Sequence, residues 1–126
     1  MVPGVTSPFY ATVGFEVDET TAHGAVVRAN ELEPLRNREG WCHGGAIAAL
    51  ADAAATQAAA RSGGAGRGSA TVELTVSYLD SAVEGPLVAR GEVVAVHDRR
   101  IEVRVEIRAN DRVVAVARAM VVRGRT

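Results

Sequence analysis

The sequence predicts an α+β domain in which one long helix is wrapped by a curled antiparallel sheet. Three observations support this prediction: an alanine-rich apolar segment at 44–61, four later segments of alternating polarity, and connections between those four that are too short for helical crossovers. The 126 residues suffice for one core but not for two independent ones. We therefore expect a single domain over residues 1–126.

The first half of the chain predicts two short strands and one long helix. Pro and Ser signals predict a turn of helix at 7–11, and strands are expected at 12–17 and 24–29. The segment 44–61, GGAIAALADAAATQAAAR, is dominated by the strongest helix former and is apolar almost all the way round. Such a helix must be covered by other structure.

The second half predicts a sheet. Residues 62–69, SGGAGRGS, predict a glycine-rich loop, and strands are expected near 70–79, 86–97, 100–109 and 112–122. In the third of these strands Ile101, Val103, Val105 and Ile107 alternate with charged residues, which predicts one dry face and one wet face. Asn110-Asp111 is a hairpin signal that joins the last two strands.

Composition places the chain among ordinary globular proteins. Apolar residues make up 48%, charged residues 23%, and the formal net charge is -1, so we expect no nucleic-acid partner. Cys42 is the only cysteine, which excludes an internal disulfide and favours a reducing compartment. No apolar run approaches the ~20 residues that span a bilayer. We expect a cytoplasmic protein that has no membrane partner.

Asp52 is the only ionisable side chain between Gly44 and Ala60. A buried carboxylate without a partner costs several kcal/mol, because even a neutral polar group costs roughly 2–7 kcal/mol. Asp52 therefore either pairs with an arginine, caps a loop, or serves a reaction.

The residues around Asp52 favour a reaction. Gly45, Ala48, Asp52 and Thr56 recur at helical spacing and form a stripe of small residues that contains one acid. A ligand or a second helix can approach such a stripe closely. On the opposite side of the predicted helix, Ile47, Leu50 and Ala54 suit the sheet.

The predicted helix begins at His43-Gly44-Gly45. Unpaired backbone N–H groups and the positive end of the helix dipole are what a developing oxyanion at a thioester carbonyl requires. The two glycines allow a substrate to come close to the backbone, although Gly-Gly is equally compatible with a simple turn.

One chain cannot bring this helix start and Asp52 to the same carbonyl. Gly44 and Asp52 are eight residues apart, which is about 12 Å along a helix. Because donors and base must lie within about 3 Å of the reacting atoms, we expect two antiparallel helices across a two-fold axis. Each of two sites would then use Gly44 of one chain and Asp52 of the other.

The segments NREGWCHGGAIAALAD and TVELTVSYLDSA resemble the hotdog-fold acyl-CoA thioesterases, in the phenylacetyl-CoA thioesterase-like branch of the hydroxybenzoyl-CoA thioesterase superfamily. The resemblance covers nearly the whole chain. Its most specific residues, at the family spacing, are Asn37, His43, Gly44, Gly45, Leu50 and Asp52. The resemblance implies a five- to six-stranded sheet around the central helix, a homodimer that pairs sheets and helices, and often a homotetramer of two dimers.

The resemblance also implies catalytic roles. The Gly44 N–H would donate to the thioester oxygen, and Asn37 would orient the carbonyl or the water. Asp52 of the partner chain would act as general base or nucleophile, with Thr71 holding the attacking water beside it. His43 lies by the thioester in the family.

Further candidates are substrate contacts. Gly45 and Thr56 lie on the small-residue stripe, and Arg99 and Arg100 stand where the family places basic residues near the nucleotide end of coenzyme A. Each has a structural alternative: Asn37 makes a turn, Thr71 is an ordinary strand residue, Thr56 bonds its own helix backbone, and the arginines form a charged hairpin in water.

Other functions are less well supported by the residues. Cys42 and His43 are adjacent and do not face one another, which disfavours a thiol nucleophile. One cysteine and three scattered histidines show no metal-ligand spacing, and we expect no metal or cofactor. The main alternative is a hotdog protein that binds acyl-CoA without hydrolysing it. A hotdog dehydratase would require a histidine paired with an acid across the site.

Overall fold

The structure is a computed structural model that describes residues 7–62 and 68–124. Its elements in chain order are α1 (Pro8–Val13), β1 (Phe15–Thr20), β2 (Gly24–Ala29), the 3-10 helix η1 (Glu33–Leu35), α2 (Gly44–Arg61), β3 (Ser69–Tyr78), β4 (Leu87–His97), β5 (Arg100–Ala109) and β6 (Arg112–Arg123). The predicted α+β class is confirmed.

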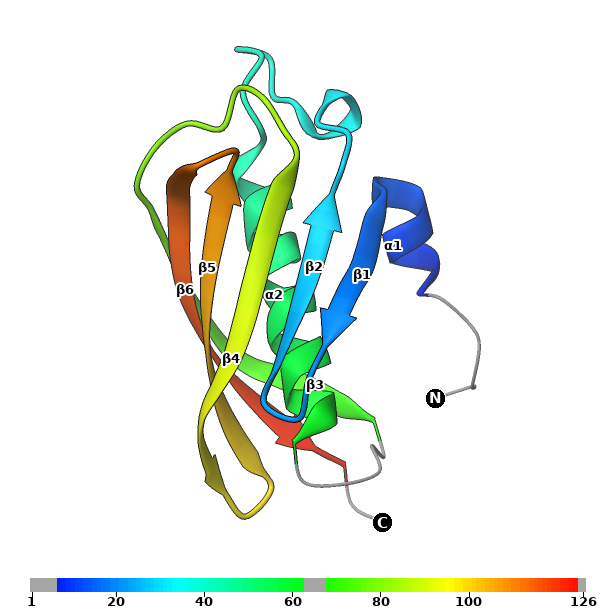
Figure 1. The fold of residues 1–126 in the computed structure, drawn as a ribbon, viewed down its shortest axis with the longest axis vertical. Helices are drawn as coiled ribbons and strands as arrows, with labels where there is room; N and C mark the ends of the chain where they lie inside the picture. Colours follow the sequence, from blue (N-terminus) through cyan, green and yellow to red (C-terminus); the bar gives the residue numbers. More distant parts are fainter. Residues whose placement is uncertain (1–6, 63–67, 125–126) are drawn as a thin grey trace.

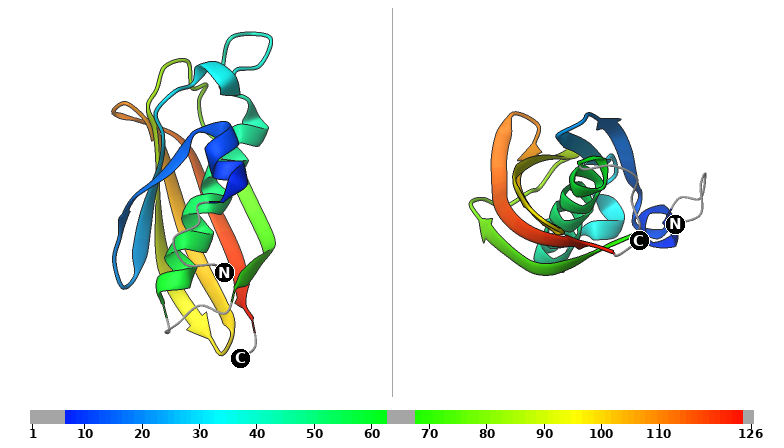
Figure 2. Two further views of the ribbon diagram at one scale, coloured as in Figure 1. Left: turned by 90° about the vertical axis from the view of Figure 1, so that its right-hand side faces the viewer. Right: turned by 90° about the horizontal axis from the view of Figure 1, so that it is seen from below.

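All six strands form one antiparallel sheet in the order β1-β2-β4-β5-β6-β3. The sheet curls around α2, which lies in its concave side (Figure 1 and Figure 2). β3 follows α2 in the chain but lies at the edge of the sheet beside β6, and residues 79–86 return the chain to β4. This arrangement places β3 along one side of α2.

The predicted long helix and most of the predicted strands are confirmed. The bounds of α2, β2 and β5 agree with the sequence prediction. β4 and β6 differ from it by one residue at one end, and β3 is shifted by one residue at both ends. Asn110 adopts a left-handed backbone conformation with φ 55 in the β5–β6 hairpin, as the turn signal indicated. Of the predicted loop at 62–69, residues 63–67 lie outside the described residues.

The predicted strand at 12–17 is wrong at both ends, because β1 begins at Phe15 and continues to Thr20. Thr12 and Val13 belong to α1, which extends to Val13 rather than ending at residue 11. Gly14 ends this helix with φ 78, a left-handed conformation that glycine adopts without strain, and its N–H donates to the carbonyl of Tyr10. Phe15, the first buried side chain, then begins β1.

Small residues allow α2 to lie directly on the sheet. Leu50, Ala51, Ala54, Ala55 and Ala58 are fully buried. A Cβ atom added to Gly91 of β4 would lie 2.6 Å from the carbonyl oxygen of Ala54, so only glycine fits at this contact. The inward side chains of β5 complete the core, and the predicted dry face is confirmed.

Candidate active site

The first turn of α2 carries a backbone donor without a partner. His43 is the N-cap, and its Nδ1 accepts a hydrogen bond from the Gly45 N–H at 3.0 Å. The His43 carbonyl accepts from the N–H groups of Ala46 and Ile47. Among the described residues the Gly44 N–H has no acceptor, and it lies at the positive end of an 18-residue helix. Gly44 and Gly45 are the first residues of the helix, so the interpretation of Gly-Gly as a turn before it is wrong.

Asp52 is half-buried and hydrogen-bonded. Thr71 Oγ1 of β3 donates to Asp52 Oδ1 at 2.5 Å. No arginine of the described residues lies within ion-pair distance of Asp52, so the structural alternative of an arginine pair is not supported there. The carboxylate is thus oriented by a neutral hydroxyl, and in the single chain it is less buried than the sequence suggested.

The predicted stripe of small residues is the uncovered face of α2. Gly45 is exposed, and Ala48, Asp52 and Thr56 are half-buried. Ile47, Leu50 and Ala54 are buried on the other side, as predicted. Thr56 Oγ1 donates to the carbonyls of Asp52 and Ala53, so its hydroxyl bonds the helix backbone, which was the structural alternative for this residue.

Gly44 and Asp52 do not meet within one chain. They lie eight residues apart on an unbroken helix, which corresponds to about 12 Å. β3 contacts both, because Tyr78 Oη donates to the Gly44 carbonyl at 2.8 Å while Thr71 donates to Asp52.

A β-bulge in β3 allows both contacts. Thr71 and Tyr78 are seven residues apart, and side chains of a regular strand seven residues apart point to opposite faces. Thr71 pairs with Val121 and Glu73 pairs with Met120, so Val72 is the extra residue of a bulge. Thr71, like Tyr78, therefore lies opposite an inward-facing residue of β6, and the Val72 side chain is 62% exposed.

Asn37 makes a turn and also borders the site. Its Oδ1 accepts from the N–H groups of Glu39 and Trp41, at 2.9 and 3.1 Å. Because Oδ1 is occupied, the side chain offers its Nδ2 group as a hydrogen-bond donor. Asn37 and Gly44 line the same groove.

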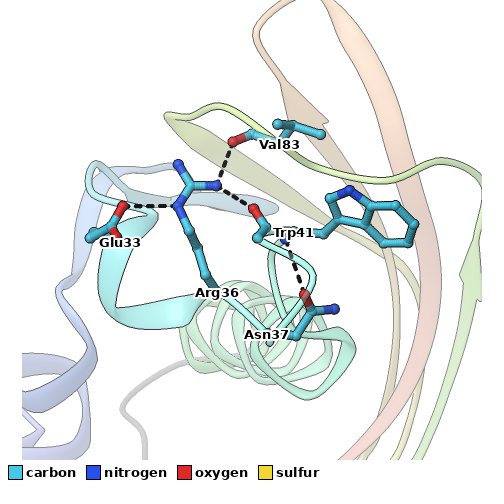
Figure 3. A network of polar contacts seen from close by, with 6 residues as sticks. Glu33, Arg36, Asn37, Trp41 and Val83 are labelled. Atoms are coloured by element: carbon cyan, nitrogen blue, oxygen red, sulfur yellow. Dashed lines mark hydrogen bonds and ion pairs between the residues drawn. The ribbon is translucent and has the colours of Figure 1, made fainter.

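Arg36 holds this turn in place, and no feature of the sequence pointed to it. Its guanidinium bonds Glu33 Oε2 at 2.9 Å, the Gly40 carbonyl at 2.6 Å and the Val83 carbonyl at 2.7 Å. Figure 3 shows Arg36 between η1, the turn and the loop after β3. No local motif signals this role, because Val83 lies 47 residues away in the chain.

A groove of about 510 Å³ opens beside the first turn of α2. Its apolar and aromatic lining includes Trp41, Ile47, Tyr78 and Leu79, and Asn37 lies at its border. Tyr78 and Leu79 are 52% and 58% exposed in the single chain. The alternating pattern of β3 is the sequence signal that would have pointed to Tyr78.

Cys42 is unsuited to nucleophilic catalysis. Its side chain is buried, and burial raises the pKa of the thiol to about 11, although the Arg36 charge acts in the opposite direction. The thiol therefore stays protonated near neutral pH. This agrees with the sequence, which also disfavoured a thiol nucleophile.

The predicted arginine pair lies at the opposite end of the molecule from Gly44. Arg99 and Arg100 belong to the β4–β5 hairpin, at the lower end of Figure 1. Arg99 donates to the carbonyl of Arg123, and Arg100 is exposed. Within residues 7–62 and 68–124 no group of three His, Cys, Asp or Glu side chains is arranged to hold a metal ion.

Comparison with known proteins identifies the family. Residues 39–116, which contain α2, β3, β4, β5 and the start of β6, match the thioesterase superfamily. The chain belongs to this superfamily, and its six-stranded sheet around one long helix is the hotdog fold.

Solved structures agree with this assignment. The conserved protein PA5202 from Pseudomonas aeruginosa superposes with a TM-score of 0.87 at 28% identity, over 94% of this chain and 95% of that chain. A mutant of the phenylacetic acid degradation protein PaaI from Thermus thermophilus gives 0.83 at 27% identity, over 94% and 100%. A thioesterase family protein from Silicibacter pomeroyi shares the fold, with a TM-score of 0.87 at 22% identity over 93% and 89%. In the described part of the chain, neither α1 nor α2 is both long and apolar enough to cross a membrane.

Proposed function

We propose that the protein is an acyl-CoA thioesterase that hydrolyses a small aromatic or a short- to medium-chain acyl-CoA. One observation carries the proposal: a free backbone donor at the start of α2 and a hydroxyl-held carboxylate on the same helix are the two groups that thioester hydrolysis requires. Membership of the thioesterase superfamily supports this reaction class.

In the proposed reaction, water attacks the thioester carbonyl. Asp52 accepts a proton from that water, and the negative charge that develops on the carbonyl oxygen is stabilised by the Gly44 N–H. The C–S bond then breaks, and coenzyme A leaves as a thiolate that takes up a proton. Direct attack by Asp52 through an acyl-enzyme anhydride uses the same two groups, so both routes are retained.

We propose that each site is shared between two chains. Gly44 and Asp52 are too far apart on one helix to meet at a single carbonyl. The uncovered face of α2 carries only small residues beside Asp52, which allows a second copy of α2 to approach in the antiparallel sense. A homodimer with two equivalent sites follows, and a homotetramer is compatible with it.

The remaining candidates take supporting roles in this proposal. Asn37 donates through Nδ2 to the carbonyl or to the water, since its oxygen is occupied. His43 accepts from Gly45 at Nδ1, so the neutral imidazole carries its proton on Nε2 and acts as a donor to the substrate. The uncovered Gly45 is where the substrate passes the backbone.

Contacts to the two ends of the substrate are also proposals. The groove beside Gly44 has a mixed lining, and its apolar part, which includes Trp41 and Ile47, is proposed to contact the acyl group. Arg99 and Arg100 are proposed to contact coenzyme A phosphates. Thr56 is the weakest of the proposed substrate contacts, because its hydroxyl already bonds the helix.

A thiol-release screen over a panel of acyl-CoA substrates tests the proposal. We expect wild-type turnover on at least one substrate, and Asp52→Asn should lower kcat by about 100- to 10,000-fold, the usual contribution of a general base. Unfolding and gel filtration of the variant should match wild type, since asparagine keeps the shape of the side chain.

Two outcomes would contradict the proposal. A wild-type protein that binds acyl-CoA in calorimetry but releases no thiol is the non-hydrolytic binder. A folded Asp52→Asn variant with wild-type turnover removes Asp52 from the chemistry.

A further inference from the structure

The peptide unit between Gly44 and Gly45 is held at both of its polar ends. Its N–H donates to His43 Nδ1 at 3.0 Å, and its carbonyl accepts from Tyr78 Oη at 2.8 Å. The first contact comes from within the helix start. The second is a hydrogen bond from β3, the strand that follows α2 in the chain.

Contacts from outside the helix stabilise its first turn at this point. Two consecutive glycines leave the backbone more conformational freedom than any other pair, so the helix alone fixes the first turn weakly. The Gly44 N–H belongs to the preceding peptide unit, between His43 and Gly44, and the two units share the Gly44 Cα. A displacement of the Gly44–Gly45 unit therefore moves that Cα and the N–H beside it. The position of the Gly44 N–H therefore depends in part on the groups that hold the neighbouring Gly44–Gly45 unit.

The geometry of β3 places Tyr78 beside the start of α2. The bulge at Val72 puts Thr71 on the same side of β3 as Tyr78, and both then bond α2, one at Asp52 and one at Gly44. A Cβ atom at Gly44 would lie 3.6 Å from the Tyr78 ring, which is ordinary contact, so the ring packs directly over the glycine.

We infer that Tyr78 is a positioning residue that fixes the Gly44–Gly45 peptide unit and thereby keeps the Gly44 Cα, with the N–H beside it, in place for the substrate oxygen. The inference rests on the proposed function for its effect on turnover. Its effect on the helix start is independent of any activity. Tyr78 acts through Gly44 and takes no part in bond making or breaking.

Tyr78→Phe tests the inference, because it removes the hydroxyl and keeps the ring. One hydrogen bond to a neutral carbonyl corresponds to about a fivefold change in an equilibrium or a rate. We expect exchange of the Gly45 amide, measured by NMR on the full chain, to accelerate about fivefold, and kcat to fall by about the same factor. KM should stay within about twofold, because the Gly44 donor acts mainly in the transition state.

The only other tyrosine provides the matched control. Tyr10 Oη accepts from Gln57 Nε2 at 3.4 Å, away from the start of α2, so Tyr10→Phe deletes the same atom elsewhere. We expect Tyr10→Phe to change neither Gly45 exchange nor kcat.

The outcomes separate this inference from the proposed function. Unchanged Gly45 exchange in Tyr78→Phe overturns the inference, and so does faster exchange with unchanged kcat in an active enzyme, since Tyr78 would then only stabilise the fold. A wild-type protein that releases no thiol defeats the proposed function instead. Gly45 exchange would still decide whether Tyr78 holds the peptide unit.

Discussion

Both faces of α2 consist mainly of small residues, but the inner face packs on the sheet and the outer face carries Asp52. On the inner face, Ala54 and Ala58 are fully buried and contact β4 at Gly91. On the outer face, Ala48 is only half-buried and lies beside Asp52. Small side chains allow a close approach on both faces: the sheet of the same chain covers the inner face, and a second copy of α2 is the element proposed to approach the outer face.

We expect the inner face of α2 to determine the stability of the fold, and the outer face to determine the proposed reaction. The inner face is dry and allows almost no change of volume, because interiors are close-packed. The first turn and the outer face hold the two polar groups of the proposed reaction. The Gly44 N–H has no acceptor among the described residues, and the Asp52 carboxylate accepts from Thr71. Changes on the inner face should therefore alter the free energy of unfolding, and changes on the outer side should alter turnover.

Gly44→Pro is the substitution with the largest expected effect on the groups of the proposed reaction. Proline is favoured at the first position of a helix, and His43, with φ -60 and ψ 135, already has the conformation that a residue before proline prefers. The substitution thus deletes one N–H and leaves the helix intact. We expect kcat to fall about 100- to 1,000-fold, the usual loss for one oxyanion donor, in a thiol-release assay.

Gly44→Ala is the matched control, because it keeps the N–H and its Cβ would make only ordinary contact with Tyr78. Mixing Gly44→Pro with Asp52→Asn chains then tests the shared site. Half of the dimers are mixed, and each mixed dimer has one intact site of two, so about a quarter of wild-type activity should return. No recovery after subunit exchange would place both groups in a site within one chain and contradict the two-chain mechanism.

Gly91→Ala is the corresponding change on the inner face. The new Cβ would lie 2.6 Å from the backbone oxygen of Ala54, so β4 and α2 must move apart. We expect the free energy of unfolding, measured by urea denaturation, to fall by about 1–3 kcal/mol, the usual cost of overpacking. Gly44→Ala should show no such loss, since alanine is the better helix former. A Gly91→Ala protein as stable as wild type would show that the two elements can separate without cost.

The sequence predicted those features that depend on local pattern. The bounds of α2 follow from an alanine-rich segment between a histidine–glycine start and a glycine-rich loop, and the β5 strand follows from strict alternation. The start of β1 was misplaced because the helix-ending role of Gly14 depends on its backbone conformation, which a single glycine does not reveal.

The candidate site was predicted in part. Asp52 and Gly44 stood out because each is unusual in its own segment. Tyr78 and Arg36 did not, because their partners lie 34 and 47 residues away in the chain. Strand alternation even suggests the wrong face for one residue: it groups Val72 with Leu74 and Val76, yet Val72 is exposed and Thr71 faces inward. The bulge overrides the pattern at the position where Asp52 needs a partner.

A third test, with a smaller expected loss of turnover than Gly44→Pro, asks what that bulge achieves. Thr71→Val keeps the volume of the side chain and removes the hydroxyl that donates to Asp52 at 2.5 Å. Hydrogen bonds to charged groups contribute about 1.5–3 kcal/mol, and part of this stabilises the carboxylate equally in the ground and transition states. We therefore expect a loss of about tenfold in kcat, measured by thiol release.

Two further variants show whether the hydroxyl or the strand matters. Thr71→Ser keeps the donor and should retain most of the activity. Thr75→Val makes the same chemical change farther along β3, past the bulge at Val72. Thr75 pairs with the exposed Arg118, so this substitution should have no effect on turnover. If Thr71→Val and Thr75→Val are equally active, the hydroxyl beside Asp52 does not orient the carboxylate, and the bulge serves only the curvature of β3.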